Sequence, residues 1–200
     1  MLAGTRAPRP PYERPMEQMG YAVVDVETTL GDPLRGRIME LALVLPDADG
    51  HIAWSALVDP GVPVPAFARM LTGIAPDELR HAPRFHRIVP RLLLLTDTRV
   101  IVAHNARYDM AALTAECGRA GAAFDRSTLC TERLSRQLVP QLSHHNLGSL
   151  CRHFGIPFTG RHRALNDARA TAALLGRFID GFGAERVARA IHHPAREARA

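Results

Sequence analysis

Hydrophobic residues along the chain follow two kinds of spacing, and each predicts one class of secondary structure. Short runs rich in valine, isoleucine and leucine predict strands, because about 4–8 apolar residues bounded by turn residues suit a buried strand. These runs cover 21–26, 38–45, 52–58, 100–103 and 127–130. The first three follow one another closely, and Asp47-Ala48-Asp49-Gly50 forms a turn before the third, so we expect them to pair as an antiparallel meander.

Apolar residues at helical spacing predict helices after and between the later strands. The expected helices cover 66–71, 76–80, 85–95, 107–120, 132–138, 147–154 and 164–179, and a basic terminal helix covers 185–200 and frays at Pro194. Gly121, Gly155 and Gly181 stand near the ends of three of them, where glycine commonly terminates a helix. Strands that alternate with helices in this way predict an α/β domain with a mixed sheet and helices on its faces.

Length and composition fit one folded domain with polar ends. The 200 residues are 46% hydrophobic and 22% charged, which is typical of a globular protein and not of a disordered or coiled-coil chain. Residues 1–19 are rich in arginine and proline and lack hydrophobic periodicity, so we expect a flexible tail there, with Met16 or Met19 as alternative starts. The domain is predicted over 20–182, followed by a basic C-terminal tail over 183–200.

Several sequence features predict a cytoplasmic protein without a membrane partner. No apolar run approaches the roughly 18–20 residues of a membrane-spanning helix, and the N-terminal residues lack the apolar segment of a secretory signal. The three cysteines, Cys117, Cys130 and Cys151, are odd in number and lack metal-ligand spacing. We therefore expect free thiols in a reducing compartment.

The charge of the chain is compatible with a nucleic-acid partner. The formal net charge is +5, and all 25 basic residues are arginines. The planar guanidinium group binds two phosphate oxygens at once, which suits nucleic-acid recognition. Biased codon usage explains an arginine-only composition as well. Four arginines at near-helical spacing form a stripe that we expect to be a solvated face, namely Arg80, Arg84, Arg87 and Arg91.

Two carboxylates end the first strand, which is otherwise apolar. Asp25 and Glu27 are two positions apart, so their side chains point to the same face of the strand. Neighbouring carboxylates repel each other when buried, and Mg²⁺ or Mn²⁺, which prefer oxygen ligands, would offset that repulsion. A solvated turn just beyond the strand would accommodate them equally, so the pair alone does not decide between the two arrangements.

A second polar segment joins the strand over 100–103 to the helix that follows. Within His104-Asn105-Ala106-Arg107-Tyr108-Asp109, we expect Asn105 to be the N-cap and Asp109 to lie in the first helical turn. This position is close to the carboxyl end of the sheet, where sites of α/β proteins gather. An acid also favours a helix N-terminus without a catalytic role. Further along this helix, Cys117 is expected in the core and Glu116 on the surface.

The third polar segment, Arg161–Asp167, precedes the long helix near the C-terminus. Within one helix, His162 and Asp167 would diverge by about 140°. We therefore place His162 in the loop before a helix that starts at about Arg163, which lets both side chains face one site. A histidine beside acids can act as a general base, although most histidines in a protein are surface or structural groups.

Taken in chain order, these segments resemble the motifs of a known enzyme family. The segments Asp25-x-Glu27-Thr28-Thr29, His104-Asn105-x-x-Tyr108-Asp109 and His162-x-x-x-x-Asp167 resemble exonuclease motifs I, II and III of the DEDDh family, which includes ribonuclease T and the proofreading epsilon subunit of bacterial DNA polymerase III. Leu71-Thr72-Gly73-Ile74 is similar to the family's segment that packs against the terminal bases. The resemblance covers about 20–182 and implies a ribonuclease H-like fold, with a mixed five-stranded sheet flanked by helices.

The resemblance also implies roles for single residues. Asp25, Glu27, Asp109 and Asp167 would hold two divalent cations, Mg²⁺ or Mn²⁺, about 3.5–4 Å apart as in two-metal sites, and His162 would be the general base. The implied substrate contacts are Thr28, Thr29, Leu71, Ile74, His104, Asn105 and Arg163. For Leu71 and Ile74, packing in the core is an equal alternative.

Three positions depart from the family pattern. The usual sequence D-x-E-T-T-G-L becomes Asp25-Val26-Glu27-Thr28-Thr29-Leu30-Gly31, in which leucine and glycine are exchanged. This exchange affects the loop beside the 3′ nucleotide and leaves the metal ligands intact. Tyr108 stands where phenylalanine is commoner.

These implications predict a metal-dependent 3′–5′ exonuclease that releases nucleoside 5′-monophosphates from single-stranded or frayed DNA, in replication or repair. One alternative is an exoribonuclease, because the motifs do not reveal how the 2′-hydroxyl is read. Another is a non-catalytic nucleic-acid-binding or polymerase-tethering module, against which the intact motif residues argue. Docking to a DNA polymerase or a helicase is a further possibility for the basic tail, through Arg186, Arg189, Arg196 and Arg199.

Overall fold

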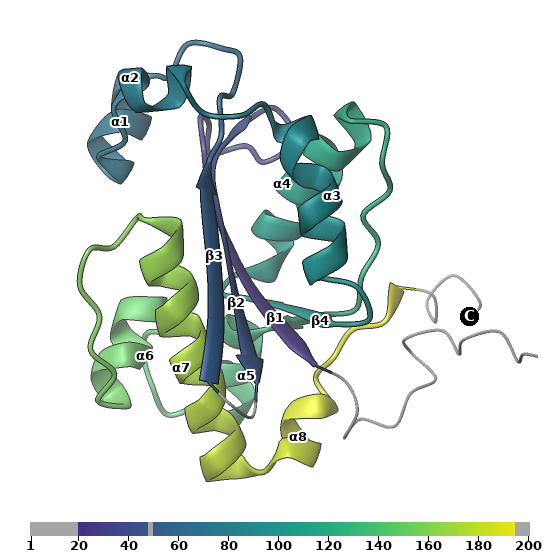
Figure 1. Ribbon diagram of the computed structural model, residues 1–200. Helices are drawn as coiled ribbons and strands as arrows, with labels where there is room; N and C mark the ends of the chain where they lie inside the picture. Colours follow the sequence, from purple (N-terminus) through teal and green to yellow (C-terminus); the bar gives the residue numbers. More distant parts are fainter. Residues whose placement is uncertain (1–19, 48–49, 195–200) are drawn as a thin grey trace, which may run out of the picture.

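The predicted mixed sheet is present in the computed structural model, which describes residues 20–47 and 50–194 (Figure 1). Its five strands lie in the order β3-β2-β1-β4-β5. Their bounds are Tyr21–Thr28 (β1), Ile38–Asp47 (β2), Gly50–Leu57 (β3), Val100–Ala103 (β4) and Thr128–Cys130 (β5). The first three form the expected antiparallel meander, and β4 and β5 continue the sheet in parallel. The tail predicted over 1–19 and the centre of the turn at 48–49 lie outside the described residues.

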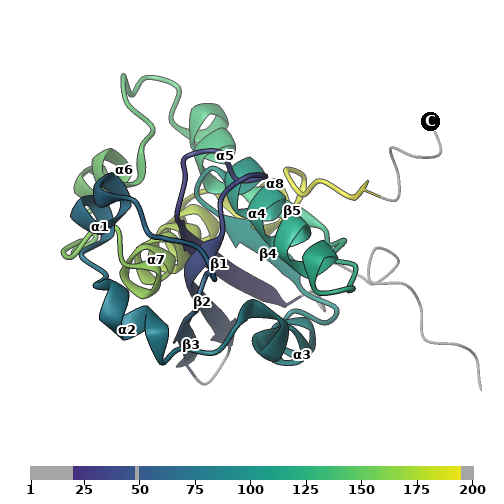
Figure 2. The ribbon, with the colours of Figure 1, turned by 90° about the horizontal axis from the view of Figure 1, so that it is seen from above.

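Helices cover both faces of the sheet, as the alternating pattern predicts. Their bounds are Ala66–Thr72 (α1), Pro76–Arg80 (α2), Phe85–Leu95 (α3), Ala106–Arg119 (α4), Thr131–Leu138 (α5), Leu147–His153 (α6), Ala164–Phe182 (α7) and Ala184–Ala188 (α8). Helices α3 and α4 pack on one face, and α5 to α8 pack on the other (Figures 1 and 2). Helix α7 continues past Gly181 and ends before Gly183, whose φ of 88° suits glycine.

Strand β1 lies in the middle of the sheet and is buried on both faces. Ala22, Val24 and Val26 belong to the core under α3 and α4, whereas Val23 belongs to the core under α7. Because side chains alternate along a strand, Asp25 and Glu27 continue the face of Val23 and point toward α7. The central strand therefore presents two carboxylates on the face that α7 covers.

The C-terminal segment differs from the predicted basic helix. The helix ends at Ala188, and the backbone of His192 then exchanges two hydrogen bonds with Thr128, of 2.8 and 2.9 Å. Val187 is fully buried. Burial of this side chain and the unpaired outer edge of β5 explain why the chain extends the sheet instead of prolonging the helix. The boundary at residue 183 stays a prediction, and Arg196 and Arg199 lie outside the described residues.

Glu116 was expected on the surface but is buried, with 2% of its surface exposed. Its carboxylate accepts hydrogen bonds from Arg37 at 2.5 Å and from the backbone of Ile38 at 3.3 Å. Arg119 lies 3.4 Å away. A buried charge needs partners of this kind, and two of them, Arg37 and Ile38, lie just before and at the start of β2, far away in sequence. Glu116 therefore joins α4 to the sheet.

The arginine stripe on α2 and α3 is exposed, as predicted, and three of its members have partners. Arg80 pairs with Asp77, and Arg84 lies 2.9 Å from Asp59. Arg91 lies over the ring of Trp54, at 5.5 Å from its centroid. The arginines of the stripe therefore form local contacts with neighbouring side chains at the surface.

The three cysteines are free thiols, as predicted. Burial raises the pKa of Cys117 and of Cys151 to about 11, so both stay protonated near neutral pH. Among the described helices, none combines the length and the apolar character needed to cross a membrane.

Candidate active site

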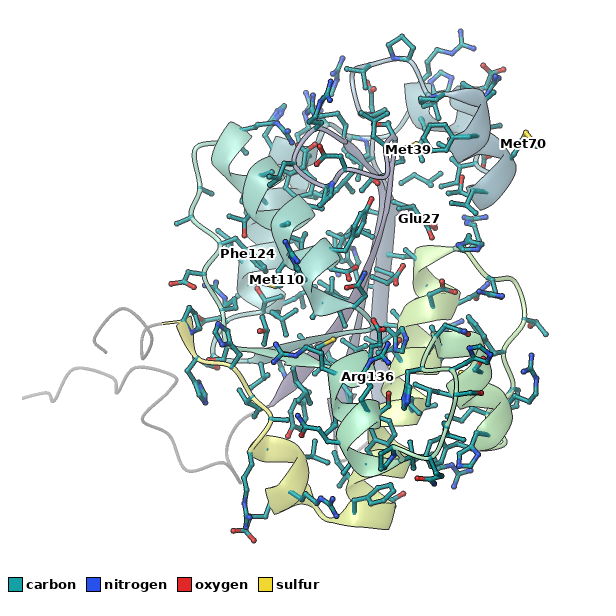
Figure 3. The ribbon with its side chains drawn as sticks, turned by 180° about the vertical axis from the view of Figure 1, so that it is seen from behind. Glu27, Met39, Met70, Met110, Phe124 and Arg136 are labelled. Carbon is teal, nitrogen blue, oxygen red and sulfur yellow. The ribbon has the colours of Figure 1, made fainter. Side chains whose placement is uncertain are left out.

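A cavity of about 400 Å³ opens where β1 and β4 reach their carboxyl ends. Residues from β1, α1, α4 and α7 line it, so segments distant in the sequence meet there. Nine of the predicted site residues are among them: Asp25, Glu27, Thr28, Leu71, His104, Asn105, Asp109, His162 and Asp167. The other three, Thr29, Ile74 and Arg163, do not line this cavity. Figure 3 shows Glu27 on the central strand.

Strand β1 supplies the first two carboxylates. Glu27 pairs with Glu40 of β2, and Thr28 pairs with Ile38, so the register shifts between Glu27 and Thr28. Such a bulge bends a strand and commonly occurs beside active sites. It ends the regular ladder at the point where the chain leaves the sheet toward Leu30, and this leaves both carboxylates at the cavity wall.

Helix α4 brings in the third carboxylate, Asp109. Its Oδ1 accepts a hydrogen bond of 3.2 Å from the backbone nitrogen of Val26. Strand β4 pairs with β1 only up to Val23, so Asp109 satisfies an amide of β1 beyond the paired region. Asn105 occupies the predicted N-cap position, but its side chain forms no cap hydrogen bond, and its φ is 68°. The structure therefore confirms the place of Asn105 and not its capping contact.

His162 lies in the loop before α7, as predicted, because that helix begins at Ala164. The φ of His162 is 62°, and its backbone nitrogen lies 3.4 Å from Oδ2 of Asp167. The Asn166 amide donates to the carbonyl of Gly160 at 2.9 Å. Gly160 has a φ of 65°, which favours glycine, and a Cβ at this position would lie 2.6 Å from that amide and displace the Asn166 side chain. These contacts hold the loop in a shape that directs His162 toward the acids: one ligand atom from each of Glu27, His162 and Asp167 lies within 4.8 Å of the others.

Arg163 holds α7 in place instead of lining the cavity. Its guanidinium group lies 3.1 Å from Oε1 of Glu40, and the backbone nitrogen of Ala164 donates to Oε2 of Glu40 at 3.0 Å. Glu40 is 4% exposed, and it accepts from the first residue of α7. Sequence reasoning missed Glu40. The sequence shows Glu40 as a lone acid in an apolar strand. Its position opposite Glu27 could not be predicted, because it depends on the register between two strands.

The two threonines after Glu27 have different surroundings. Thr28 lines the cavity, and its hydroxyl contacts Tyr108 and donates to the carbonyl of Leu30 at 2.7 Å. Tyr108 donates to the same carbonyl at 2.9 Å. Thr29 is buried, and its hydroxyl accepts from the backbone nitrogen of Arg37 at 3.0 Å. Only Thr28 is therefore placed to contact a ligand in the cavity, and Tyr108 stabilises the loop where leucine and glycine are exchanged.

The two apolar residues of Leu71-Thr72-Gly73-Ile74, the segment similar to the family's base-packing segment, also have different surroundings. Leu71 is 51% exposed and lines the cavity, whereas Ile74 is 1% exposed and packs with Met39 and Leu79. Ile74 is therefore a core residue and does not line the cavity. Phe67, also 51% exposed, lines the cavity beside Leu71 and was missed. Its position four residues before Leu71 was the available indication, because such residues share a helix face.

The carboxylates make the cavity strongly acidic. Burial, together with the neighbouring acids, raises the pKa of Asp25 well above its ordinary value. The same causes raise the pKa of Glu27 to about 8, and burial raises the pKa of Asp109 to about 7 and that of Asp167 above its usual range. The buried Oδ1 of Asp167 has no hydrogen-bond partner among the described residues. Hard oxygen donors with unsatisfied charge fit a site for divalent cations.

His104 differs from these acids because it stays neutral. Burial is the main cause that lowers its pKa to about 4. Its Nδ1 lies 3.0 Å from the hydroxyl of Thr131 at the start of α5. The ring therefore lines the cavity without a charge, and it also contacts the start of α5.

The raised pKa values predict that the metal-free protein loses stability as pH rises from about 6.5 to 8.5. In the folded state, Glu27 has a pKa of about 8 and Asp109 a pKa of about 7, whereas their ordinary values are 4.5 and 3.8. Both carboxyl groups therefore keep their protons to a higher pH in the folded state than in the unfolded state. The folded state thus binds more protons, and its stability falls with pH. Below pH 6.5, the lowered pKa of His104 acts in the opposite direction.

Thermal unfolding in EDTA across this pH range measures the effect. Glu27→Gln should flatten the decrease in Tm, and Mg²⁺ should raise the Tm most at the alkaline end. Glu185→Gln, at an exposed position of α8, is the matched control. Equal slopes for the wild type and Glu27→Gln would contradict the prediction.

Comparison with known proteins identifies the family of the chain. The RNase_T exonuclease family model matches residues 22–175. The PolC-type DNA polymerase III of Halalkalibacterium halodurans is 33% identical over 168 residues, which cover 82% of this chain and 12% of that protein. The corresponding protein of Caldanaerobacter subterraneus subsp. tengcongensis is 29% identical over 161 residues, or 80% of this chain and 12% of its own length. The chain thus spans only a small part of these relatives.

Solved structures show the same fold. Exonuclease X in complex with 5′ overhanging duplex DNA aligns with a TM-score of 0.69 at 26% identity, over 84% of this chain and 98% of that one. Exonuclease I of E. coli in complex with a dT13 oligonucleotide aligns with a TM-score of 0.71 at 21% identity, over 81% of this chain and 41% of that one. The sheet is therefore ribonuclease H-like, as the sequence resemblance implied. Together with the family match over 22–175, this shows that the chain belongs to the DEDDh-type family of 3′–5′ exonucleases.

Proposed function

We propose that this protein is a metal-dependent exonuclease that removes nucleoside 5′-monophosphates from the 3′ end of DNA. The observation that supports this most directly is the gathering of four carboxylates and His162 in one cavity. Buried carboxylates at this density are unfavourable without positive partners. The nearby guanidinium group of Arg163 is bound to Glu40. The site is thus suited to cations from solution.

The ligand set would consist of Asp25, Glu27, Asp109 and Asp167, and two cations, Mg²⁺ or Mn²⁺, would occupy it. Such cations neutralise the carboxylates, lower the pKa of a bound water and offset the negative charge of a phosphodiester. The unpartnered Oδ1 of Asp167 and the raised pKa of Glu27, to about 8, support this assignment. Glu40 and Arg163 would contribute by fixing the start of α7, which carries Asp167.

His162 would act as the general base. Its ring stands within reach of the acids at the cavity wall, and it would accept a proton from the water that attacks the terminal phosphodiester. The new bond joins the water oxygen to phosphorus, and the bond from phosphorus to the 3′ oxygen of the preceding nucleotide breaks. That oxygen takes up a proton and becomes a new 3′-hydroxyl. The released nucleotide keeps its 5′ phosphate.

Phe67 and Leu71 would contact the last bases of the substrate. Both side chains are half exposed at the rim of the cavity, on one face of α1. Stacking on a base is typically worth about 1–3 kcal/mol and tolerates any sequence. These contacts need unpaired bases, so we expect a single-stranded or frayed end.

DNA is the substrate that the comparisons favour. The relatives at 29–33% identity are DNA polymerases, and the structure of exonuclease X contains duplex DNA. The same relatives support a DNA polymerase as a partner of this chain. A cytoplasmic location remains a prediction from the sequence.

A cleavage assay tests the proposal. The protein would be incubated with a 5′-labelled single-stranded DNA or its RNA counterpart, in Mg²⁺, Mn²⁺ or EDTA. We expect a ladder that shortens from the 3′ end, needs the metal and forms faster with DNA. A faster ladder with RNA would support the exoribonuclease alternative. Binding without cleavage of either strand would support a tethering module and contradict the proposal.

A further inference from the structure

A second, larger cavity of about 640 Å³ lies beside the active site. We call it the α4–α5 groove, after the two helices that border it together with β5. Its apolar lining includes Met110, Phe124 and Leu134. Figure 3 labels Met110, Phe124 and also Arg136, which comes from α5. Small-molecule sites have volumes of roughly 300–1,000 Å³, so the groove has room for a base and its sugar.

The groove and the active-site cavity share one lining residue. Asn105 lines both cavities, at the point where β4 passes into α4. On the active-site side, Asn105 stands next to His104; on the other side, the groove runs along Arg107 toward α5. The two cavities therefore lie on either side of Asn105, so a strand that extends from the carboxylates past this residue would reach the groove.

Arginines give the groove an excess of positive charge. It is lined by four arginines and two acids, namely Arg107, Arg126, Arg133, Arg136, Asp125 and Glu132. Arg136 pairs with Glu132 at 2.7 Å. Within the part of the chain that the structure describes, neither Arg107 nor Arg133 has an ion pair or a side-chain hydrogen bond, and both are exposed. These two guanidinium groups are available to an anionic ligand.

Arg126 adds an unsatisfied donor. Its guanidinium group lies over the ring of Phe124, at 5.3 Å from the centroid, and it donates to the carbonyl of Asp125 at 2.9 Å. Its Nε is buried and has no partner among the described residues. A buried donor of a charged group normally has an acceptor, so this atom indicates a missing one.

We propose that the α4–α5 groove binds the single strand on the 5′ side of the scissile phosphate, with phosphates at the arginines and bases against the apolar lining. This inference rests on the proposed function and adds the path of the substrate. Arginine suits phosphate because its planar group binds two oxygens at once, and an apolar surface between arginines suits a base. The position of the groove beside Asn105, next to the active-site cavity, and its excess of cationic groups both favour a nucleic-acid strand over a protein partner.

Two substrates separate the groove from the catalytic step. The nitrophenyl ester of thymidine 5′-monophosphate has no strand beyond the scissile bond, whereas a 5′-labelled dT12 extends into the groove. For Arg107→Glu/Arg133→Glu, we expect KM on dT12 to rise about tenfold or more and the slope of log KM against log salt to fall by about 1.4, at roughly 0.7 per phosphate contact. The rate of ester hydrolysis by this variant should stay within about twofold of the wild-type rate, because the ester does not reach the groove.

A matched double variant tests whether charge alone explains the result. Arg87→Glu/Arg177→Glu makes the same charge change at exposed positions of α3 and α7, outside the groove. Equal losses on dT12 in both double variants would overturn the proposal.

Fluorescence anisotropy in EDTA keeps the groove test independent of activity. The wild type should bind labelled dT12 more tightly than dT3, and Arg107→Glu/Arg133→Glu should remove that gain. Absence of dT12 cleavage in Mg²⁺ or Mn²⁺ with intact dT12 binding would reject the proposed function and support the groove. Failure of dT12 to bind better than dT3 would overturn the groove whether or not the ester is cleaved.

Discussion

Asp25→Ala is expected to abolish cleavage while leaving a folded protein, and Asp167→Ala should do the same. Each substitution removes an oxygen ligand from the carboxylate cluster, where the charge of the phosphodiester must be offset. Loss of a single preorganised stabilising group costs about 10²–10³ in rate in other enzymes, and loss of a cation ligand should cost at least that much. Activity should therefore fall below detection in a ladder assay.

The folded state should tolerate the loss of Asp25, and without metal it should become more stable. Burial and the neighbouring Asp109, Asp167 and Glu27 raise the pKa of Asp25, which indicates that its charged form is unfavourable in the empty cluster. In EDTA at pH 8, we expect a higher Tm for Asp25→Ala than for the wild type. In Mg²⁺, the order should reverse, because the wild type alone gains binding free energy from the metal.

The matched control is Asp180→Ala, at an exposed position of α7 far along the helix from Asp167. It should retain wild-type cleavage in the ladder assay and wild-type thermal unfolding. Metal-dependent cleavage by Asp25→Ala at more than about a tenth of the wild-type rate would show that Asp25 is not a required ligand.

His162→Ala is expected to lower the rate by about 10²–10⁴, the usual contribution of a general base. The backbone adds a complication, because His162 has a φ of 62°, in the left-handed region that alanine disfavours. A displaced loop would therefore also lower the activity of the alanine variant. Asparagine tolerates this region better, so His162→Asn removes the base and keeps the backbone.

Both variants should lose a similar factor in kcat and keep Mg²⁺-dependent stabilisation, measured as the rise in Tm. Added imidazole should restore part of the activity of His162→Ala, which a purely structural role would not allow. His153→Ala, at an exposed position of α6, is the control. Full activity in His162→Asn would reject the general-base assignment.

Local sequence patterns were sufficient for most secondary structure. The ranges 76–80, 85–95 and 100–103 agree with α2, α3 and β4 to the residue, and the meander is confirmed. These elements depend on apolar spacing and on glycine or proline at their ends, and both act between neighbours in the chain. The predicted helix over 185–200 was wrong for residues 189–193, because a contact with the distant β5 competes with its local pattern, and residues 195–200 lie outside the described part of the chain.

The sequence by itself was enough to select the carboxylates and the histidine that line the cavity. Two-residue alternation put Asp25 and Glu27 on one face, and the helix start after Arg163 kept His162 in a loop. Only the tertiary structure decided which neighbours they have. Glu40 binds Arg163, Ile74 enters the core, and Asn105 lies between two cavities. The reason is physical: alternation and helix starts follow from backbone geometry over a few residues, whereas register, burial and cavity walls depend on packing between segments that the sequence separates.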